Sequence, residues 1–411
     1  MALNYIWIGF FVVAFAVAVI RFIFTGDTEI FSIIIDSTFS SSKSAVMDIA
    51  LPLTGVMVLW LGLMNIGERA GAVNFLSRIA GSFFVRLFPE LPRKSPVFGQ
   101  MLMNFSANML GLDNAATPLG LKAIQGLQNE NPRKDTASNA QIMFLAINTS
   151  GLTIIPVSIL AQRAILGAVH PTDIFIPVLI ATTVSTLTAI IVVALWQRIN
   201  LLDPILLSWI GGITVAIGVL TWWIGSMEKE QIEVVSKVGS NLLLILVIGA
   251  FIVGAVFKKV NVYEAFIDGA QNGFNVTIKI IPYLVGMLVG IAVFRASGTM
   301  DYIINGLAWL FGAMGLNTDF VAALPTAFMK PLSGSGAKAM MVEAMQHYGP
   351  DSFAGRLSCL FQGAADTTFY IIALYFGSVG IRKTRYAIAA GLIADLSGVI
   401  AAIVLAYLFF V

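Results

Sequence analysis

The sequence has few charged residues, two histidines and one cysteine, and each scarcity excludes a class of protein. Only 11% of the 411 residues are charged, whereas 58% are hydrophobic, and the mean hydropathy is +0.89. These values exclude an ordinary soluble domain and indicate a membrane protein with several spanning segments. The single cysteine, Cys359, excludes a disulfide framework and any cysteine-based metal site. The isolated histidines, His170 and His347, are interpreted as loop residues and not as metal ligands.

Patterns typical of catalysis or nucleic-acid binding are also missing. The net charge is only +2 and no basic cluster is present, so we expect no nucleic-acid partner. No paired carboxylates and no nucleophile–base set are present, so we expect neither an enzyme nor a cofactor beyond a coupling ion. The stretch Gly334–Lys338 superficially looks like a phosphate-binding loop, but its glycine spacing is wrong and no strand precedes it.

Long apolar runs are abundant and predict an all-α integral membrane protein with nine spanning helices. They are Tyr5–Phe24, Ala45–Asn65, Ala137–Leu160, Ile174–Trp196, Ile205–Trp223, Ser240–Phe257, Pro282–Phe294, Ser352–Gly377 and Tyr386–Phe410. The first is interpreted as a retained helix and not as a signal peptide, because it is long and lacks a positive leader. Two stretches that mix apolar and polar residues, Ile30–Met47 and Asn261–Ile280, are predicted to lie along the membrane surface as arm helices.

Four apolar runs are too short to span a membrane and form two pairs, each joined by a polar turn. The runs are Pro96–Leu110, Thr117–Gln128, Phe320–Met329 and Ala337–Gln346. The first would give about 22 Å of helix, less than the thickness of a bilayer core. Thr117 and Pro118 fit the N-cap and first residue of the helix that follows the first turn. We therefore predict two re-entrant hairpins, whose turns need protein or water to satisfy their backbone.

Two of the predicted spanning helices contain polar breaks. Ala137–Leu160 is interrupted at Asn148–Gly151 and again at Pro156, and Ser352–Gly377 is interrupted at Gln362–Thr368. The order of arm, spanning helix, amphipathic helix, hairpin, broken helix and closing helix thus occurs twice. We predict two structural repeats, residues 1–200 and 238–411, connected by a joining helix and an external loop at 201–237.

The basic residues of corresponding loops predict that the two repeats are inverted. Arg133 and Lys134 follow the first hairpin, whereas 347–351 after the second contains neither lysine nor arginine. After the broken helices the bias reverses, because 161–173 contains one arginine and 378–385 contains three basic residues. Positively charged loops tend to face the cytoplasm, so corresponding loops are expected on opposite faces. This places the N-terminus in the cytoplasm and the C-terminus outside.

Several motifs resemble those of one family. N-x-x-G-L-D-N-A-A-T-P-L-G-L-K-A at Asn108–Ala123 and F-L-A-I-N-T-S at Phe144–Ser150 resemble spore maturation protein A. P-L-S-G-S-G-A-K from Pro331, G-P-D-S-F from Gly349 and Q-G-A-A-D-T-T-F-Y from Gln362 resemble spore maturation protein B. The whole chain is similar to a fusion of the two, with the predicted helix at 205–223 as the joining helix.

Both proteins belong to the gate-domain group that includes nucleoside transporters and the membrane part of ferrous iron transporters. The resemblance implies a bacterial inner-membrane location, a nucleoside-transporter-like gate scaffold and an elevator-type mechanism. Relatives of this kind also make a homo-oligomer plausible. The sequence contains no G-domain, which weakens the ferrous iron alternative.

The polar breaks and hairpin turns supply the candidate site. An interrupted helix leaves N–H groups free at one end and carbonyls at the other, which attract anionic groups and cations respectively. The candidate substrate-binding residues are Asn114, Thr117, Asn148, Thr149, Ser150, Ser333, Ser335, Asp366, Thr367 and Thr368. The candidate ion-coupling residues, for Na⁺ or H⁺, are Asp113, Asp366 and Asp395.

These candidates also have structural interpretations. The Ser333 turn is either part of a substrate site or a helix-capping turn, and Asp113 is either a ligand or a solvated loop residue. Asp366 lies within an apolar stretch, where an ionisable group is costly, and this favours a functional role over a structural hydrogen bond. Asp395 serves either helix packing or proton coupling. Gly391 and Gly398 of the last helix are interpreted as close-packing positions.

Two classes of function remain. The first is secondary transport of a small polar solute, nucleoside-like by analogy with the family, coupled to an ion gradient across the lipid bilayer. The second is a non-transporting membrane component of envelope or spore maturation that acts through partner proteins. Polar groups within both broken helices favour the first, because a purely structural protein has little use for them.

Overall fold

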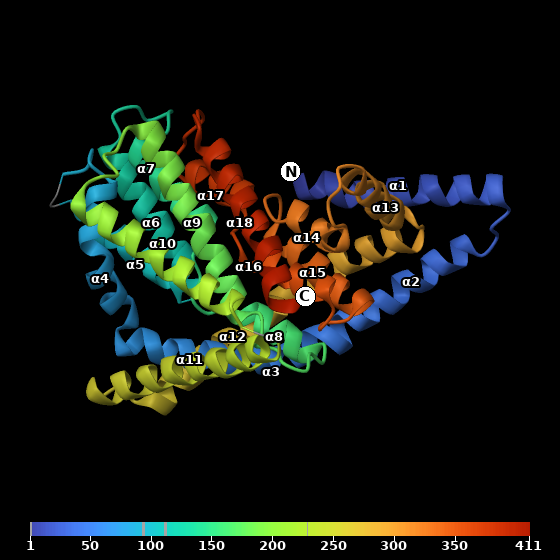
Figure 1. The fold of residues 1–411 in the computed structure, drawn as a ribbon, viewed down its shortest axis with the longest axis horizontal. Coiled ribbons are helices and arrows are strands. Elements are labelled where there is room, and N and C mark those ends of the chain that lie inside the picture. Colours follow the sequence, from blue (N-terminus) through green and yellow to red (C-terminus); the bar gives the residue numbers. More distant parts are fainter. Residues whose placement is uncertain (1, 93–94, 111–112, 228) are drawn as a thin grey trace. The chain divides into compact units, whose positions relative to one another are not determined.

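The computed structural model describes residues 2–92, 95–110, 113–227 and 229–411, and most of these residues are helical (Figure 1). Within these ranges the chain forms no β-strand, and one isolated bridge joins Thr136 to Lys383. Six of the described helices are long and apolar enough to cross a membrane. A seventh span is obtained if the bent pair Leu284–Ala296 and Thr299–Ala313 is counted. The chain is therefore an all-α, multi-pass membrane protein.

The described spans are fewer than the nine predicted, because one predicted span is divided and another is described only in part. Ala137–Leu160 is divided into α7 (Asn139–Ser150) and α8 (Val157–Ile165), and each piece is too short to cross a bilayer alone. The second, Ser240–Phe257, lies within α11 (Lys229–Phe257), and its apolar part is described from Asn241 onward.

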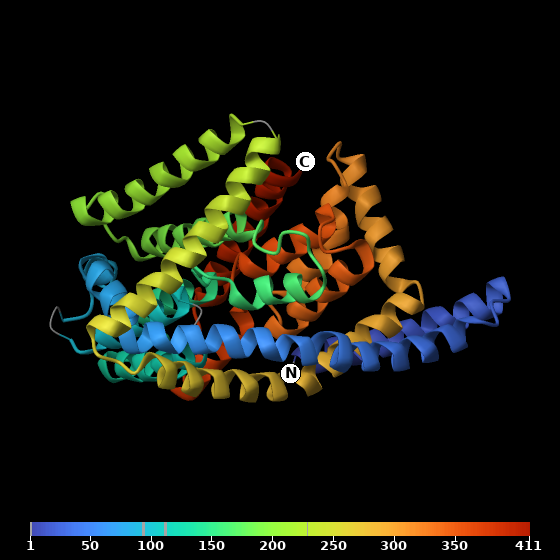
Figure 2. The same cartoon turned by 90° about the horizontal axis from the view of Figure 1, so that it is seen from below.

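The predicted arms are not separate helices. The first arm, α2 (Ile30–Ser44), continues through the π-helical turn η1 (Ala45–Ala50) into α3 (Leu51–Ala70). The second arm is the first part of α12 (Val262–Ala296), which continues past Pro282. Figure 2 shows α3 and α12 side by side. A Cβ atom added at Gly62 of α3 would lie 2.5 Å from the Phe266 ring of α12, so this glycine permits the close approach.

The same series of elements occurs in both halves of the chain. The first half contains α1 (Ala2–Thr25), the α2–η1–α3 run, α4 (Ala72–Leu87), α5 (Val97–Met109), α6 (Asp113–Glu130), α7, α8 and α9 (Phe175–Gln197). After α10 (Pro204–Gly225) come α11, α12, α13 (Thr299–Ala313), η2 (Asp319–Ala323), α14 (Leu324–Met329), α15 (Gly334–Tyr348), α16 (Phe353–Gly363), α17 (Thr368–Ser378) and α18 (Ala387–Phe410). The long helix of each half ends at a left-handed glycine, Gly71 or Gly298, each with φ of 85°.

Both hairpins and both breaks lie where they were predicted, but the helix starts are shifted. α6 begins at Asp113, so Thr117 is not its N-cap as predicted. An acidic residue in the first turn of a helix is favourable, which suits a start at Asp113. The first turn, Gly111–Leu112, lies outside the described residues.

The chain divides into two compact units. Unit 1 contains Met1–Leu59, Ser158–Pro171 and Ala270–Gln362, and unit 2 contains Trp60–Val157, Thr172–Gly269 and Gly363–Val411. Each unit therefore includes segments from both predicted repeats. The chain passes from one unit to the other next to both helix breaks, after Val157 and after Gln362.

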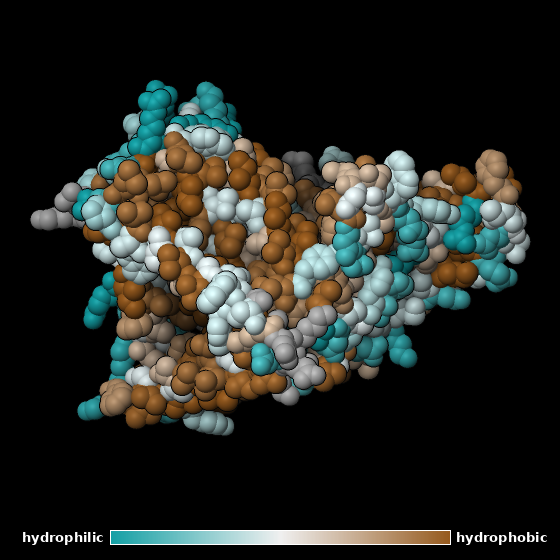
Figure 3. Space-filling model, in the orientation of Figure 1, coloured by the Kyte–Doolittle hydropathy of each residue, from teal (hydrophilic) through white to brown (hydrophobic). Residues whose placement is uncertain are grey.

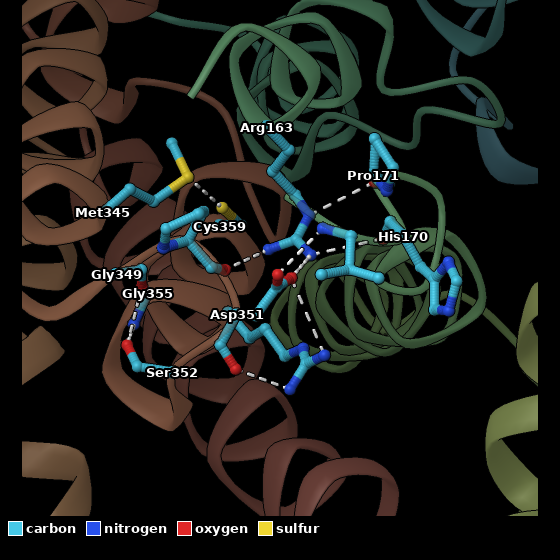
Figure 4. A network of polar contacts seen from close by, with 12 residues as sticks. Arg163, His170, Pro171, Met345, Gly349, Asp351, Ser352, Gly355 and Cys359 are labelled. Carbon is cyan, nitrogen blue, oxygen red and sulfur yellow. Dashed lines mark hydrogen bonds and ion pairs between the residues drawn. The ribbon is translucent and has the colours of Figure 1, made fainter. Parts of the chain in front are cut away.

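In unit 1, the loop after α8 is fastened to the loop before α16 (Figure 4). Arg163 is fully buried, and its guanidinium donates to the carbonyl of Pro350 at 2.5 Å and to Oδ1 of Asp351 at 3.0 Å. The other oxygen of Asp351 accepts the backbone N–H of Val169 at 2.8 Å. A buried arginine needs several acceptors to offset its lost hydration, and these loops supply them.

In unit 2, the loop before α7 is fastened to the loop after α17. The carbonyl of Asp135 accepts the N–H groups of Arg382 at 2.9 Å and Lys383 at 3.0 Å, and Ala137 N–H donates to the carbonyl of Lys383 at 3.0 Å. The Lys383 ammonium lies 3.4 Å from the Asp135 carboxylate. Each broken helix thus contributes one flanking loop to unit 1 and the other to unit 2, and each loop pairs with a loop of the other broken helix.

The core of unit 2 is built from α4, α5, α6, α7, α9, α17 and α18, with α9 and α18 side by side (Figure 1). Tyr375 of α17 stacks on Phe144 of α7, with ring centroids 5.9 Å apart. On the face seen in Figure 3, the helices of unit 2 present mostly apolar side chains. Hydrophilic side chains gather at the end that carries the α6–α7 and α17–α18 loops.

Replacing Gly120 with alanine should destabilise the packing of α6 on α17. A Cβ atom at Gly120 would overlap the hydroxyl of Tyr375 and lie 2.5 Å from its Cζ. We expect Gly120→Ala to lower the free energy of unfolding by about 1–3 kcal/mol, as overpacking does. Tyr375→Phe removes the obstructing oxygen, so the double variant should be more stable than the two single effects predict. Unfolding midpoints in detergent measure both effects, and strict additivity would contradict the proposed contact.

Candidate functional site

The two broken helices meet in unit 2, where the carboxyl end of α7 contacts the amino end of α17. The backbone N–H of Asp366, in the second break, donates to the carbonyl of Thr149 in the last turn of α7 at 2.7 Å. Gly151 ends α7 in a left-handed conformation with φ of 58°, and an added Cβ would lie 2.9 Å from the Asp366 Cβ. Only glycine suits both the conformation and the space, so Gly151 allows the two helix ends to join.

Two neighbouring helices complete the hydrogen bonding of the first break. Thr182 of α9 donates its hydroxyl to the carbonyl of Gly151 at 3.0 Å. At the end of α5, the carbonyl of Met109 accepts the N–H of Ile154 at 2.7 Å. Asn108 Nδ2 donates to Asn148 Oδ1 at 2.9 Å, so the first hairpin is attached to the same break. These bonds satisfy backbone groups that a helix end leaves without partners.

The predicted residues at the end of α7 use their side chains within that helix. Asn148, Thr149 and Ser150 donate to carbonyls one turn earlier, at 2.9, 3.1 and 3.0 Å. All three residues are buried. The hydroxyl hydrogens of Thr149 and Ser150 are engaged in this way, and Asn148 Oδ1 accepts from Asn108.

Asp366 presents an exposed carboxylate at this junction. Its Oδ1 accepts the N–H of Thr367 at 2.7 Å, directly before the first turn of α17. The positive end of the helix dipole stabilises a carboxylate in this position. Thr367 and Thr368 are buried beside it. Asp366 therefore supplies a negative charge, fixed in position by this hydrogen bond, that a solute or a cation can reach.

Asp395, in the middle of α18, also contacts this junction and is only 5% exposed. One of its oxygens, Oδ2, accepts the hydroxyl of Thr368 at 2.8 Å. One turn earlier, a Cβ at Gly391 would lie 2.6 Å from Thr368 Cγ2, and a Cβ at Gly398 would lie 3.1 Å from the carbonyl of Ala364. The prediction that both glycines are close-packing positions is confirmed, and the packing brings Asp395 to the start of α17.

The remaining candidates belong to the two hairpins. Thr117 lies in α6 and is half-buried, whereas the side chains of Asp113 and Asn114 lie outside the described part of the structure. Ser333 and Ser335 belong to unit 1. There Ser333 is the N-cap of α15, and its Oγ accepts the N–H of Gly336 at 3.0 Å and lies 3.2 Å from Ser335 Oγ. Ser333 therefore caps α15, and the predicted substrate contact of this turn stays a prediction.

Sequence reasoning missed three contributors from neighbouring helices, namely Asn108, Thr182 and Ser185. Ser185 is buried and donates to the carbonyl of Ala394 in α18 at 2.9 Å. Hydroxyl residues inside the predicted span Ile174–Trp196 were a usable signal, because a spanning helix rarely carries polar groups without a partner. Among the described residues, no group of three or more His, Cys, Asp or Glu side chains could hold a metal ion.

Replacing Thr182 with valine should destabilise the first break without changing the volume of the side chain. The carbonyl of Gly151 would lose one of its two hydroxyl donors and keep Thr153, which donates to it at 2.9 Å, so we expect a cost of about 0.5–1.5 kcal/mol. Thr183 is the matched control, because its hydroxyl bonds only to the carbonyl of Leu179 in its own helix, at 2.6 Å. We expect Thr182→Val to lower the unfolding midpoint clearly and Thr183→Val to leave it almost unchanged. Equal midpoints for the two variants would contradict the role of Thr182.

The comparisons with known proteins agree with this architecture. A family described as nucleoside recognition (Gate) matches residues 50–166 and 277–382, which include both hairpins and both breaks. Spore maturation protein B of Bacillus subtilis (strain 168) is 43% identical over 178 residues, which are 43% of this chain and 98% of that protein. Spore maturation protein A of the same organism is 38% identical over 189 residues, which are 46% of this chain and 92% of that protein. Similarity to both, each over about half of the chain, confirms the predicted resemblance to a fusion, and the chain belongs to the Gate family.

Proposed function

We propose that the protein is a secondary transporter that moves a small polar solute, nucleoside-like by family analogy, and that an ion gradient drives it. The observation that carries this proposal is the junction of two broken helices, with the exposed carboxylate of Asp366 between a helix carboxyl end and a helix amino end. Broken helices of this kind form substrate and ion sites in transporters. The description of the Gate family supports a nucleoside-like solute.

The chemistry of the junction suits a neutral or zwitterionic polar solute. The first N–H groups of α17 attract acceptor oxygens, and Asp366 accepts hydrogen bonds from hydroxyl or amino groups. Carbonyls at the end of α7 suit a coupling cation such as Na⁺, and Asp366 or Asp395 suits a proton. In this proposal the protein binds and releases its solute unchanged, so it is not an enzyme and needs no cofactor besides the coupling ion.

Reciprocal loop contacts support an inverted arrangement of the repeats. The loop before α7 pairs with the loop after α17, and the loop after α8 pairs with the loop before α16. The start of each broken helix thus lies beside the end of the other broken helix, which means that the two run antiparallel. The two broken helices therefore cross the membrane in opposite directions in this proposal, as inverted repeats require.

The charges of the paired loops support an orientation. The pair in unit 2 carries Arg133, Lys134, Arg382, Lys383 and Arg385, whereas the 347–351 loop of unit 1 carries neither lysine nor arginine. Positively charged loops favour the cytoplasm, so this end of unit 2 faces inward in our proposal, in an inner membrane. The N-terminus is then cytoplasmic and the C-terminus external.

We further propose an elevator-type movement. Both breaks lie beside the points where the chain passes between the compact units, after Val157 and after Gln362. Interrupted helices lack continuous backbone hydrogen bonding, so these connections bend more readily than intact helices do. A second candidate is a non-transporting membrane component, which the names of the spore maturation relatives favour. Such a component would need no gradient-driven uptake, and uptake assays therefore distinguish the two.

Replacing Asp366 with asparagine should abolish transport and leave the fold intact. The substitution keeps the size of the side chain and removes the charge that we assign to the solute or the coupling ion. The probe is uptake of radiolabelled uridine into proteoliposomes under an inward Na⁺ or proton gradient, and we expect at least a tenfold loss. Asp301→Asn is the matched control, since Asp301 is exposed in unit 1. Unchanged uptake by Asp366→Asn would overturn the assignment of Asp366. A lack of gradient-driven uptake of any nucleoside by the unaltered protein would contradict the transporter proposal.

Single cysteines should show the two loop pairs on opposite faces of the membrane. In a Cys359→Ala background, Arg133→Cys and Lys383→Cys should react with an impermeant maleimide only from the cytoplasmic side. Val169→Cys and His347→Cys should react only from the external side, and all four positions are exposed. Labelling of all four from one side would end the inverted arrangement. The charge bias also assigns Arg93 and Glu228 to opposite faces, but both lie outside the described residues.

A further inference from the structure

A basic cavity lies at the end of unit 2 where α9 is linked to α10. The link at 198–203 joins two helices that are both long and apolar enough to span a membrane, so it lies at the membrane surface. The cavity measures about 300 Å³ and is lined by the end of α4, the α4–α5 loop and this link. Arg86, Arg198 and Asn200 give it polar donors, and Val85, Leu91 and Leu206 give it apolar walls.

The charged side chains of the cavity are arranged to bind an anion. Arg86 Nη1 lies 3.5 Å from Asp203 Oδ2, which fixes the guanidinium at the cavity wall. Asp203 is itself held as the N-cap of α10, because its Oδ1 accepts the N–H of Ile205 at 3.0 Å. Arg198 is exposed and forms no ion pair within the described part of the chain. Two guanidinium groups and one carboxylate leave a net positive charge, and guanidinium groups bind phosphate in a bidentate manner.

Hydrogen bonds connect this end of α9 with the basic loops of unit 2. Gln197 Nε2 donates to the carbonyl of Asn139 at 2.8 Å, and the hydroxyl of Tyr386 donates to Oδ1 of Asn139 at 3.2 Å. The rings of Trp196 and Tyr386 lie 5.1 Å apart, as aromatic residues do at the boundary between membrane and water. The cavity therefore opens on the basic end of unit 2, at the depth of lipid headgroups.

Exposed apolar side chains lie close in sequence to the residues that line the cavity. Leu195, Leu202 and Leu207 are each at least half exposed, and few residues in the apolar part of α10 are buried. A ligand seated here would contact cations at one end and apolar side chains at the other. A free inorganic anion would use only the first of these features, whereas a phospholipid would use both.

We propose that this cavity binds the phosphate headgroup of an anionic phospholipid of the surrounding leaflet. Arg86 and Arg198 hold the phosphate, the Asp203 carboxylate accepts a headgroup hydroxyl, and the acyl chains lie along Leu202 and Leu207. Basic pockets between spanning helices recognise lipid headgroups in this way. The site is separate from the junction at Asp366 and independent of the proposed transport.

Native mass spectrometry of the full-length protein with added phosphatidylglycerol or phosphatidylcholine tests this site. We expect retention of one phosphatidylglycerol in preference to phosphatidylcholine. The double variant Arg86→Gln with Arg198→Gln should bind phosphatidylglycerol about 30-fold more weakly, because each surface cation contributes about 1 kcal/mol to anionic lipid binding. Lys383→Gln is the matched control, since it removes one positive charge from the same end of unit 2 outside the cavity, and it should bind normally.

A second variant separates a seated headgroup from general charge attraction. Val85→Trp fills the cavity without changing the charge and should also weaken phosphatidylglycerol binding, with an unchanged elution volume on size exclusion. Equal retention of both lipids, or normal binding by both the double arginine variant and Val85→Trp, would overturn the proposal. Displacement of the lipid by millimolar inorganic phosphate would assign the cavity to a free anion and would equally overturn it.

Discussion

The structure depends on one constraint, which is that backbone polar groups within a membrane must find partners inside the protein. Each broken helix exposes such groups in the middle of its path, and the two breaks satisfy one another. The N–H of Asp366 from the second break bonds to the carbonyl of Thr149 at the first. A carbonyl of the first break is bonded by the hydroxyl of Thr182. Polar residues at this depth are therefore required by the architecture, and the binding site that we propose uses the same groups.

Close packing makes this arrangement possible. Gly151 brings the break residues together, and Gly391 and Gly398 let α18 approach the start of α17. A helix pair that approaches so closely gains dispersion contacts and short hydrogen bonds in place of a hydrophobic driving force, which is weak in lipid. The hydroxyl of Ser185 adds such a bond to α18. The glycines and hydroxyl residues of these helices thus serve one purpose, which is to hold two helix ends against each other.

Much of this fold could be predicted from the sequence, because breaks and spans leave local signals. Asn148–Gly151 and Gln362–Thr368 interrupt apolar runs with polar residues, and the structure places the breaks there. The first residue of a helix was harder to predict, as the start of α6 at Asp113 shows. Where several polar residues follow one another, each of them can begin a helix. The sequence also did not reveal that each arm continues as one helix into the span that follows it. A stretch of mixed apolar and polar residues does not by itself interrupt a helix.

Contacts between residues far apart in the sequence could not be derived from local patterns. The charge bias suggested which loops share a face, and the pairing of Asp135 with Lys383 brings two of these loops together. The partners of Arg163 left no such signal, because a lone arginine between apolar residues does not identify its acceptors. Thr182 was similarly hidden, although hydroxyl residues within a spanning helix often form hydrogen bonds between helices.

The reciprocal loop pairs have a consequence for how the chain is assembled. Arg163 and Asp135 come from the first half of the sequence, and their partners, Asp351 and Lys383, come from the second. Neither half contains a complete pair, so each needs the other in a ratio of one to one. A single polypeptide fixes that ratio at synthesis and replaces an encounter between two chains with a search inside one, at a much higher effective concentration. The connection through α10 and α11 therefore acts as a tether that sets stoichiometry.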